Sequence, residues 1–267
     1  MTPGKLLLPL LIPGFVILMG FASVPHPSDA PDSVSAEPQV VILANLKVFI
    51  EGPYVDVADS MSTNLILLDE LPLTQPYDSS IYVGTQLEYA GTELVSDWTG
   101  ARATVVDWVL VELRTTTAAS SAFATRAGLL LSTGVIVDID GTSALGFSSQ
   151  PAGDYYVVVR QRNHLAVMSA APITMDATTP ALYDFSTAQS QAFGTNPMIE
   201  IETGVFGMYS GDADGSTGVT ATDNTAWLAE NGTAGYLTSD FDLSGGATAT
   251  DNTIWLGNNG ISDTIPD

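Results

Sequence analysis

Apolar residues divide the middle of the chain into short segments with the length and composition of β-strands. Residues 40–50, 105–114 and 155–160 are rich in Val, Ile, Leu and aromatic residues, and Gly or Pro clusters separate them. β-branched and aromatic residues favour the pleated, half-buried surface of a sheet. Residues 126–140 indicate a hairpin that turns at residues 132–134, residues 164–168 add another strand, and residues 199–208 lead into the C-terminal part of the chain. Short strands separated by turns predict a mainly β fold, an antiparallel β-sandwich.

A Leu-rich patch between Ser60 and Leu73 follows neither the strand nor the helix period. Pro72 and Pro76 close it, and proline interrupts regular pairing because it lacks a backbone N–H. We expect irregular structure here, with Leu65, Leu67 and Leu68 packed toward the core.

The C-terminal part of the chain contains two copies of one twelve-residue acidic stretch, at residues 212–223 and 240–251. Each copy places an oxygen-bearing side chain at positions 1, 3, 5, 9 and 12, and Gly at position 7 supplies a backbone carbonyl. Ca²⁺ takes six to eight oxygen ligands, and this alternation is how an EF-hand-type loop surrounds it. The candidate ligands are Asp212, Asp214, Ser216, Gly218, Thr220 and Asp223 in the first copy, and Asp240, Asp242, Ser244, Gly246, Thr248 and Asp251 in the second.

A helix-like run follows each copy, and the two runs also match in sequence. Each ends at Asn-Gly, at residues 231–232 and 259–260. Trp227 and Trp255 lie four residues after Asp223 and Asp251, which is about one helical turn. We therefore expect both indoles to face a core shared by two helices. The two aspartates fall in the first helical turns, where the helix dipole favours negative charge.

This tandem arrangement, a loop plus one exiting helix repeated once, closely resembles the type I dockerin over residues 212–260. The resemblance implies a small α-helical dockerin-like domain that holds two Ca²⁺ ions and docks to a cohesin. It assigns Asp212, Asp214, Ser216, Thr220 and Asp223 to one ion, and Asp240, Asp242, Ser244, Thr248 and Asp251 to the other. Two departures predict modest affinity: position 5 is Ser in both loops, and position 6 of the first loop is Thr217, where Gly eases the turn.

The β segment carries a less specific resemblance. The run from Gly146 to Met168 looks like the Ig-like or transthyretin-like sandwiches of secreted bacterial proteins. More loosely, residues 46–208 look like the region that precedes dockerin-like repeats in surface proteins of environmental bacteria. These families supply no catalytic residue to carry over.

Composition restricts the classes of partner. The chain has 267 residues, with 30 acidic residues against 7 Lys and Arg and a net charge of −23. A strongly negative surface argues against nucleic acid and anionic membranes as partners. Cysteine is absent, which excludes disulfides, Cys-ligated zinc and a Cys nucleophile. Stability must come from packing and from bound metal.

The N-terminus has the pattern of an export signal. Lys5 precedes an apolar run from Leu6 to Ala22, and a polar, proline-rich stretch follows. A short membrane anchor is the alternative, but Pro9 and Pro13 interrupt the run, so we expect no stable membrane span after the signal is removed. We predict a signal peptide at 1–23, a flexible leader at 24–38, a β-sandwich domain at 39–208, a dockerin-like domain at 209–261 and a tail at 262–267.

The sequence offers little catalytic chemistry. The only histidines are His26 and His164, and no Gly-x-Ser-x-Gly motif occurs. We expect His164 to be a structural residue at a strand end. A polysaccharide hydrolase needs only two suitably spaced carboxylates, so it stays open as an alternative. Aromatic candidates for sugar binding are Tyr54, Tyr77, Tyr82, Tyr89, Trp98 and Trp108, although buried sandwich aromatics are the commoner explanation.

These features favour a secreted or cell-surface, non-enzymatic, calcium-binding protein that serves as a structural or adhesive subunit of an extracellular filament, surface layer or matrix. Its partners would be copies of itself. The alternative is a carbohydrate-binding accessory protein that docks to a cohesin-like protein and has glycans as further partners.

Overall fold

The segment from Val41 to Ile50 is extended throughout, and every second residue from Ile42 to Val48 is buried. This alternation agrees with the strand predicted over residues 40–50. The segment nevertheless divides into three short strands that join three different sheets, so the prediction of one strand is wrong. The pairs are β1 (Val41–Ala44) with β9 (Leu145–Ser148), β2 (Leu46–Lys47) with β8 (Val135–Val137), and β3 (Phe49–Ile50) with β15 (Val205–Met208).

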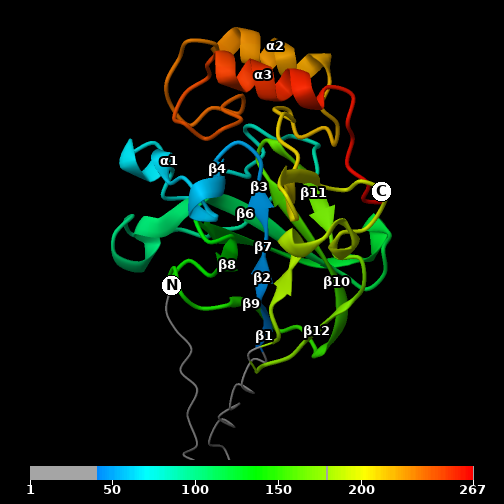
Figure 1. Cartoon of the computed structure of the whole chain (residues 1–267). Coiled ribbons are helices and arrows are strands. Elements are labelled where there is room, and N and C mark those ends of the chain that lie inside the picture. Colours follow the sequence, from blue (N-terminus) through cyan, green and yellow to red (C-terminus); the bar gives the residue numbers. More distant parts are fainter. Residues whose placement is uncertain (1–40, 179, 267) are drawn as a thin grey trace, which may run out of the picture. The chain divides into compact units, whose positions relative to one another are not determined.

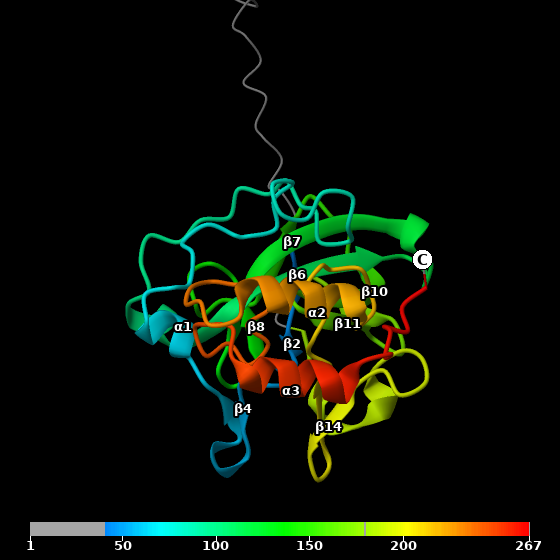
Figure 2. The same ribbon diagram turned by 90° about the horizontal axis from the view of Figure 1, so that it is seen from above.

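The computed structural model describes residues 41–178 and 180–266 (Figure 1). Within these residues the largest sheet has eight strands and is curled, as the long arcs of β6 and β7 show in Figure 2. Right-handed strand twist produces such curvature. Its order is β11 (His164–Met168), β10 (Gly153–Gln161), β6 (Val105–Arg114), β7 (Ala122–Leu131), β8, β2 and β13 (Tyr183–Asp184), and β12 (Ile173–Met175) also pairs with β10.

The fold is mainly β, as predicted, and the hairpin predicted over residues 126–140 forms from β7 and β8. Two pairings, β13 with β2 and β15 with β3, are parallel and depart from the predicted antiparallel arrangement. These partners are distant in the chain, so no hairpin fixes their direction. The remaining small sheets join β14 (Ile199–Glu202) to β15 and β4 (Tyr54–Val55) to β5 (Ser60–Met61).

The main core lies around β6, whose residues are almost all buried. Trp108 on β6 donates from its indole to the Pro72 carbonyl at 2.9 Å, and Tyr77 donates to the Trp108 carbonyl at 2.7 Å. The long connection between α1 (Asn64–Leu67) and β6 therefore covers one face of this strand. Buried aromatic rings with satisfied polar tips fix this connection against the sheet.

The Leu-rich patch packs differently from its prediction. Leu65 is fully buried, but Leu67 and Leu68 are 77% and 53% exposed, so the expectation that all three point inward is wrong. Residues 64–67 form one turn of helix, and a helical turn directs only one of these side chains to the core.

Helices α2 (Ala221–Glu230) and α3 (Ala249–Asn258) lie side by side and antiparallel (Figure 2), and both lie above the strands in the view of Figure 1. The described residues all belong to one compact unit, which includes both the sheet and these helices. The predicted boundary between residues 208 and 209 stays a prediction. Short 3-10 helices occur at η1 (Asp56–Ala58), η2 (Gly100–Thr104), η3 (Ala119–Ser121), η4 (Phe185–Thr187) and η5 (Gln189–Gln191).

The predicted signal peptide (1–23) and leader (24–38) lie outside the described residues. In the part of the chain that the structure covers, we find no helix with the length and apolarity needed to cross a bilayer. Residues of the predicted tail pack on the sheet, since Ile265 is buried and Arg114 donates to the Pro266 carbonyl at 2.9 Å.

Candidate metal centre

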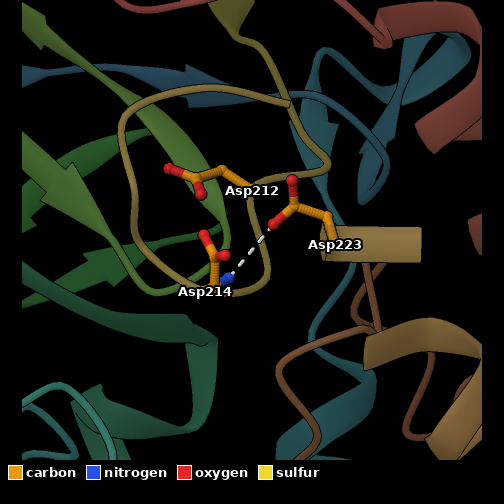
Figure 3. Close-up of side chains that lie close together, drawn as sticks. All are labelled: Asp212, Asp214 and Asp223. Carbon is orange, nitrogen blue, oxygen red and sulfur yellow. Dashed lines mark hydrogen bonds between the residues drawn. The ribbon is translucent and has the colours of Figure 1, made fainter. Parts of the chain in front are cut away.

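The loop at residues 212–223, called loop 1 below, directs three carboxylates toward one another (Figure 3). One oxygen from each of Asp212, Asp214 and Asp223 lies within 4.8 Å of the others. Asp212 and Asp223 are buried, and Asp214 is the most exposed of the three. The twelve-residue spacing therefore brings the first, third and last positions of the loop to one point.

Backbone N–H groups hold the two buried carboxylates of loop 1 in place. Asp212 accepts from the N–H groups of Ser216 at 2.9 Å and Thr217 at 3.1 Å. Asp223 accepts from Asp214 at 3.2 Å and from Thr220 at 2.7 Å. Because Asp223 is the third residue of α2 and Thr220 is its N-cap, the helix start fixes the position of this last candidate ligand.

The loop at residues 240–251, called loop 2, repeats this network. Asp240 accepts from the N–H groups of Ser244 and Gly245, both at 2.9 Å, and Asp251 accepts from Thr248 at 2.7 Å. Its three acids again approach within 4.8 Å; they are Asp240, Asp242 and Asp251. The duplicated sequence thus produces two equivalent acid clusters.

Four of the six hydroxyl and carbonyl groups expected as ligands from the spacing have hydrogen-bond partners within their own loops. Thr220 and Thr248 are helix N-caps, and each donates its hydroxyl to the last Asp of its own loop, at 3.1 and 3.0 Å. The Ser244 hydroxyl donates to the Gly246 carbonyl at 3.5 Å. All six groups lie in the loops, and their roles as ligands stay predictions: Ser216, Gly218, Thr220, Ser244, Gly246 and Thr248.

Burial makes these carboxylates hard to ionise without a bound cation. It raises the pKa of Asp212 to about 8, and the neighbouring Asp223 charge adds to this effect. Burial also raises the pKa of Asp240 to about 7, although the Arg162 guanidinium opposes the rise. The pKa values of Asp223 and Asp251 are raised for the same reason. Like charges at this separation repel strongly, and a divalent cation would remove the repulsion.

The donor set fits calcium. All of the candidate ligands are oxygens, and hard cations such as Ca²⁺ prefer carboxylate, hydroxyl and carbonyl oxygen. The chain has no Cys, and the described part contains His164 alone among histidines, outside both clusters. Zinc and copper sites usually use those softer ligands.

Both loops require left-handed backbone at two positions, whereas the spacing predicted a tight turn only at position 6. Position 6 has φ of 74° at Thr217 and 93° at Gly245. Position 4 has φ of 67° at Gly215 and 52° at Leu243. Each loop therefore has glycine at one of these positions and a residue with a side chain at the other. A left-handed conformation is costly for β-branched Thr217.

Residues 161–164 form the turn of the hairpin of β10 and β11: Gln161 ends β10, His164 begins β11, and Arg162 and Asn163 connect them. Only His164 was predicted to have a structural role, yet Asn163 contacts both loops, at Asp212 and Asp240. All four are buried, with exposures between 0 and 3%. Below, residues 161–164 are called the hairpin tip. Its Arg162 pairs with buried Asp107 at 2.9 Å and stacks over the Tyr236 ring at 4.2 Å. A run of four polar residues between apolar strands predicts an exposed turn, so this burial could not be predicted from residue type.

His164 is a structural residue, as expected. Its ring nitrogens lie 2.8 Å from the Glu51 carbonyl and 2.7 Å from Gln161 Oε1. Burial lowers its pKa to about 3, which keeps the ring neutral near pH 7. A buried ring with both nitrogens engaged is poorly placed to act as a general base.

The aromatic candidates for sugar binding separate into two groups. Trp108, Tyr77 and Tyr82 are buried in the core, as sandwich aromatics usually are. Trp98 is half-buried and lines a surface hollow of about 380 Å³ together with Asp69 and Asp97. Tyr54 and Tyr89 are also half-buried, and each donates its hydroxyl to a glutamate, Glu202 and Glu93.

Comparisons with known proteins identify no family. No protein-family model matches the chain, and no curated protein matches it. Two solved structures show a distant likeness: N-terminal and C-terminal interface mutants of a type II cohesin–X–dockerin complex from Acetivibrio cellulolyticus. Identities are 13% and 15%; in both cases 83% of this chain and 98% of the other chain are covered, with a TM-score of 0.39. At this TM-score the likeness establishes neither a shared fold nor a shared function.

Proposed function

We propose that the chain binds two calcium ions, one in loop 1 and one in loop 2, through a dockerin-like pair carried on a sandwich-type β domain. The observation that supports this most directly is the convergence of three carboxylates within 4.8 Å in both copies of a duplicated loop. Duplication matters because a chance acidic bend would not recur with the same spacing and the same backbone hydrogen bonds. Calcium would stabilise the folded state by mass action.

We propose further that the protein is a secreted, non-catalytic subunit of an extracellular assembly, in which it contacts copies of itself. Extracellular fluid supplies calcium at the levels that such weak sites need. Leu228 and Leu256 support a contact surface on the helices, because they occupy matching positions in the repeats and are 65% and 64% exposed. Large apolar side chains exposed at related positions are typical of interaction sites.

Light scattering and electron microscopy of the purified protein, with calcium and then with chelator, test the assembly role. We expect polymers with calcium and monomers with chelator. Leu228→Ser with Leu256→Ser should abolish the polymers, whereas Leu67→Ser, at a leucine 77% exposed elsewhere, should not. Monomers under both conditions would overturn the assembly role and leave the calcium sites to be judged separately.

The Trp98 hollow favours a second candidate function, carbohydrate binding. The indole N–H donates to the Leu71 carbonyl at 2.8 Å, which fixes the ring, and Asp69 and Asp97 supply acceptors for sugar hydroxyls at the same hollow. An apolar ring beside a few polar groups is typical of a small-ligand site. In this case the helices would dock to a cohesin-like partner. A glycan array with wild type and Trp98→Ala tests it, and no binding by wild type would reject it.

A further inference from the structure

The hairpin tip is buried because both calcium loops pack around it. Tips of β-hairpins normally lie in solvent, and four consecutive polar residues would be expected there. Here the backbone N–H of Leu165 donates to the Tyr209 carbonyl at 2.8 Å, just before loop 1. On the other side, Arg162 donates to the Leu237 carbonyl, just before loop 2. The tip therefore lies between the starts of the two loops.

Asn163 contacts the first ligand residue of each loop. Its backbone carbonyl accepts from the N–H of Asp212 at 3.1 Å, and it also accepts from Gly211 at 3.0 Å. Its side-chain amide donates to the carbonyl of Asp240 at 2.8 Å and to that of Thr238 at 3.0 Å. One residue thus holds position 1 of loop 1 through its main chain and position 1 of loop 2 through its side chain.

The remaining polar atoms of Asn163 are also engaged, which fixes its orientation. Its N–H donates to Gln161 Oε1 at 3.0 Å, and its Oδ1 lies 2.9 Å from His164 Nδ1. Both amide hydrogens are used, so the side chain cannot turn without breaking several bonds. A fully satisfied buried network of this kind is rigid.

We propose that Asn163 is a positioning residue that couples the two calcium sites, so that an ion in one loop raises the affinity of the other. This inference rests on the proposed calcium function. Ordering loop 1 around an ion fixes Asp212, and the shared Asn163 then holds the start of loop 2 in its binding geometry. The second ion meets a loop that has already lost part of its conformational freedom, which is positive cooperativity. Ser210 adds a second link, since it precedes loop 1 and its hydroxyl donates to the Phe241 carbonyl in loop 2 at 2.9 Å.

Asn163→Ala separates the two contacts, because it removes the amide but keeps the backbone carbonyl. Calorimetric titration with Ca²⁺ should show the affinity of the loop 2 site reduced on the order of tenfold, as expected for two lost hydrogen bonds. The loop 1 site should still bind, and the cooperativity should be strongly reduced, with the Ser210 contact as the remaining link. Amide hydrogen exchange in chelator should also show faster exchange in residues 237–245, which reports on positioning without any ion.

Gln75→Ala is the matched control. Gln75 is also buried, and its amide donates to two carbonyls, those of Tyr89 and Gly91, while its oxygen accepts from the Tyr77 N–H. It contacts neither loop. Gln75→Ala should lower stability about as much as Asn163→Ala does. It should leave both calcium affinities and their coupling unchanged.

A ligand variant keeps the proposal testable if Asn163→Ala does not fold. Asp242→Asn disables loop 2 in the otherwise intact protein, and coupling predicts that the loop 1 affinity then falls at least about fivefold. An unchanged loop 1 affinity would overturn the coupling while two-site binding by wild type stands. Wild type that binds no calcium would overturn the proposed function itself, so the two failures are distinguishable.

Discussion

Trp227 and Trp255 each donate an indole hydrogen bond to the backbone at the start of the other repeat's helix. Trp227 Nε1 lies 2.7 Å from the carbonyl of Thr248, and Trp255 Nε1 lies 2.7 Å from that of Thr220. Both acceptors are helix N-caps, so each helix holds the opposite loop in place. The two repeats are therefore joined by two matching hydrogen bonds, one in each direction.

Replacing Trp255 should destabilise this pair more than replacing Trp227. Trp255 is 8% exposed and Trp227 is half-buried, so Trp255→Phe loses packing as well as its hydrogen bond. We expect a loss of about 2 kcal/mol for Trp255→Phe and about 1 kcal/mol for Trp227→Phe in the free energy of unfolding, measured by urea denaturation with calcium. Equal losses would contradict the difference in packing.

The Arg162–Asp107 pair should be among the most sensitive contacts in the protein. Both side chains are fully buried, and Arg162→Met would leave the Asp107 charge without its partner. We expect a loss of about 3–5 kcal/mol in the free energy of unfolding. Arg102→Met is the control, because Arg102 pairs with exposed Asp97 at 3.4 Å and its loss should be below about 1 kcal/mol. Similar losses of unfolding free energy in both variants would show that the buried pair contributes no more to stability than the exposed pair.

Thr217→Gly should stabilise loop 1. Thr217 has φ of 74°, and glycine adopts this conformation without steric cost. We expect a gain of up to about 1 kcal/mol in unfolding free energy, after the entropy that glycine adds to the unfolded chain. Gly215→Ala is the opposite test, since φ is 67° there and a Cβ would lie 2.8 Å from Leu87 Cδ1. A loss of stability in Thr217→Gly would contradict the claim that the left-handed conformation of Thr217 is strained.

Calcium should reverse the pH dependence of stability between pH 8.5 and 6.5. Without an ion, the pKa of Asp212 is about 8 and that of Asp240 about 7, both above the value in the unfolded chain. Groups with a raised folded pKa stabilise the protein at low pH and lose that contribution as pH rises through the folded value. The chelated protein should therefore gain on the order of 1–2 kcal/mol as pH falls through this window.

With calcium bound, the aspartates stay ionised, so acidification should weaken binding and lower stability instead. Below pH 6.5 the lowered pKa of His164 opposes the gain, because protonation then favours the unfolded chain. Melting temperatures measured across the window, with calcium and with chelator, check both trends. Parallel slopes in the two series would show that the carboxylates hold no cation.

The strand segments and the duplicated loops could be predicted because their signals are local. The buried alternation from Ile42 to Val48 and the hairpin of β7 and β8 follow directly from residue type and turn chemistry. The Asp spacing likewise brings each triad together within twelve residues. Local patterns of this kind need no knowledge of distant contacts.

The burial of the hairpin tip between the two loops could not be predicted because its contacts are long-range. Asn163 meets Asp240 across 77 residues, and Arg162 meets Asp107 across 55. A polar Arg-Asn-His turn has the same composition whether solvent or another segment covers it. The splitting of residues 41–50 among three sheets has the same cause, since each short strand pairs with a different distant partner.

Isothermal titration of the purified, chelator-treated protein with Ca²⁺ tests the central claim most directly. Two ions should bind per chain in wild type, and one ion in Asp212→Asn or in Asp240→Asn. In each variant the remaining site should bind calcium more weakly than in wild type, because the two sites are coupled. A titration of wild type that releases no binding heat, together with a melting temperature unaffected by calcium, would contradict the account.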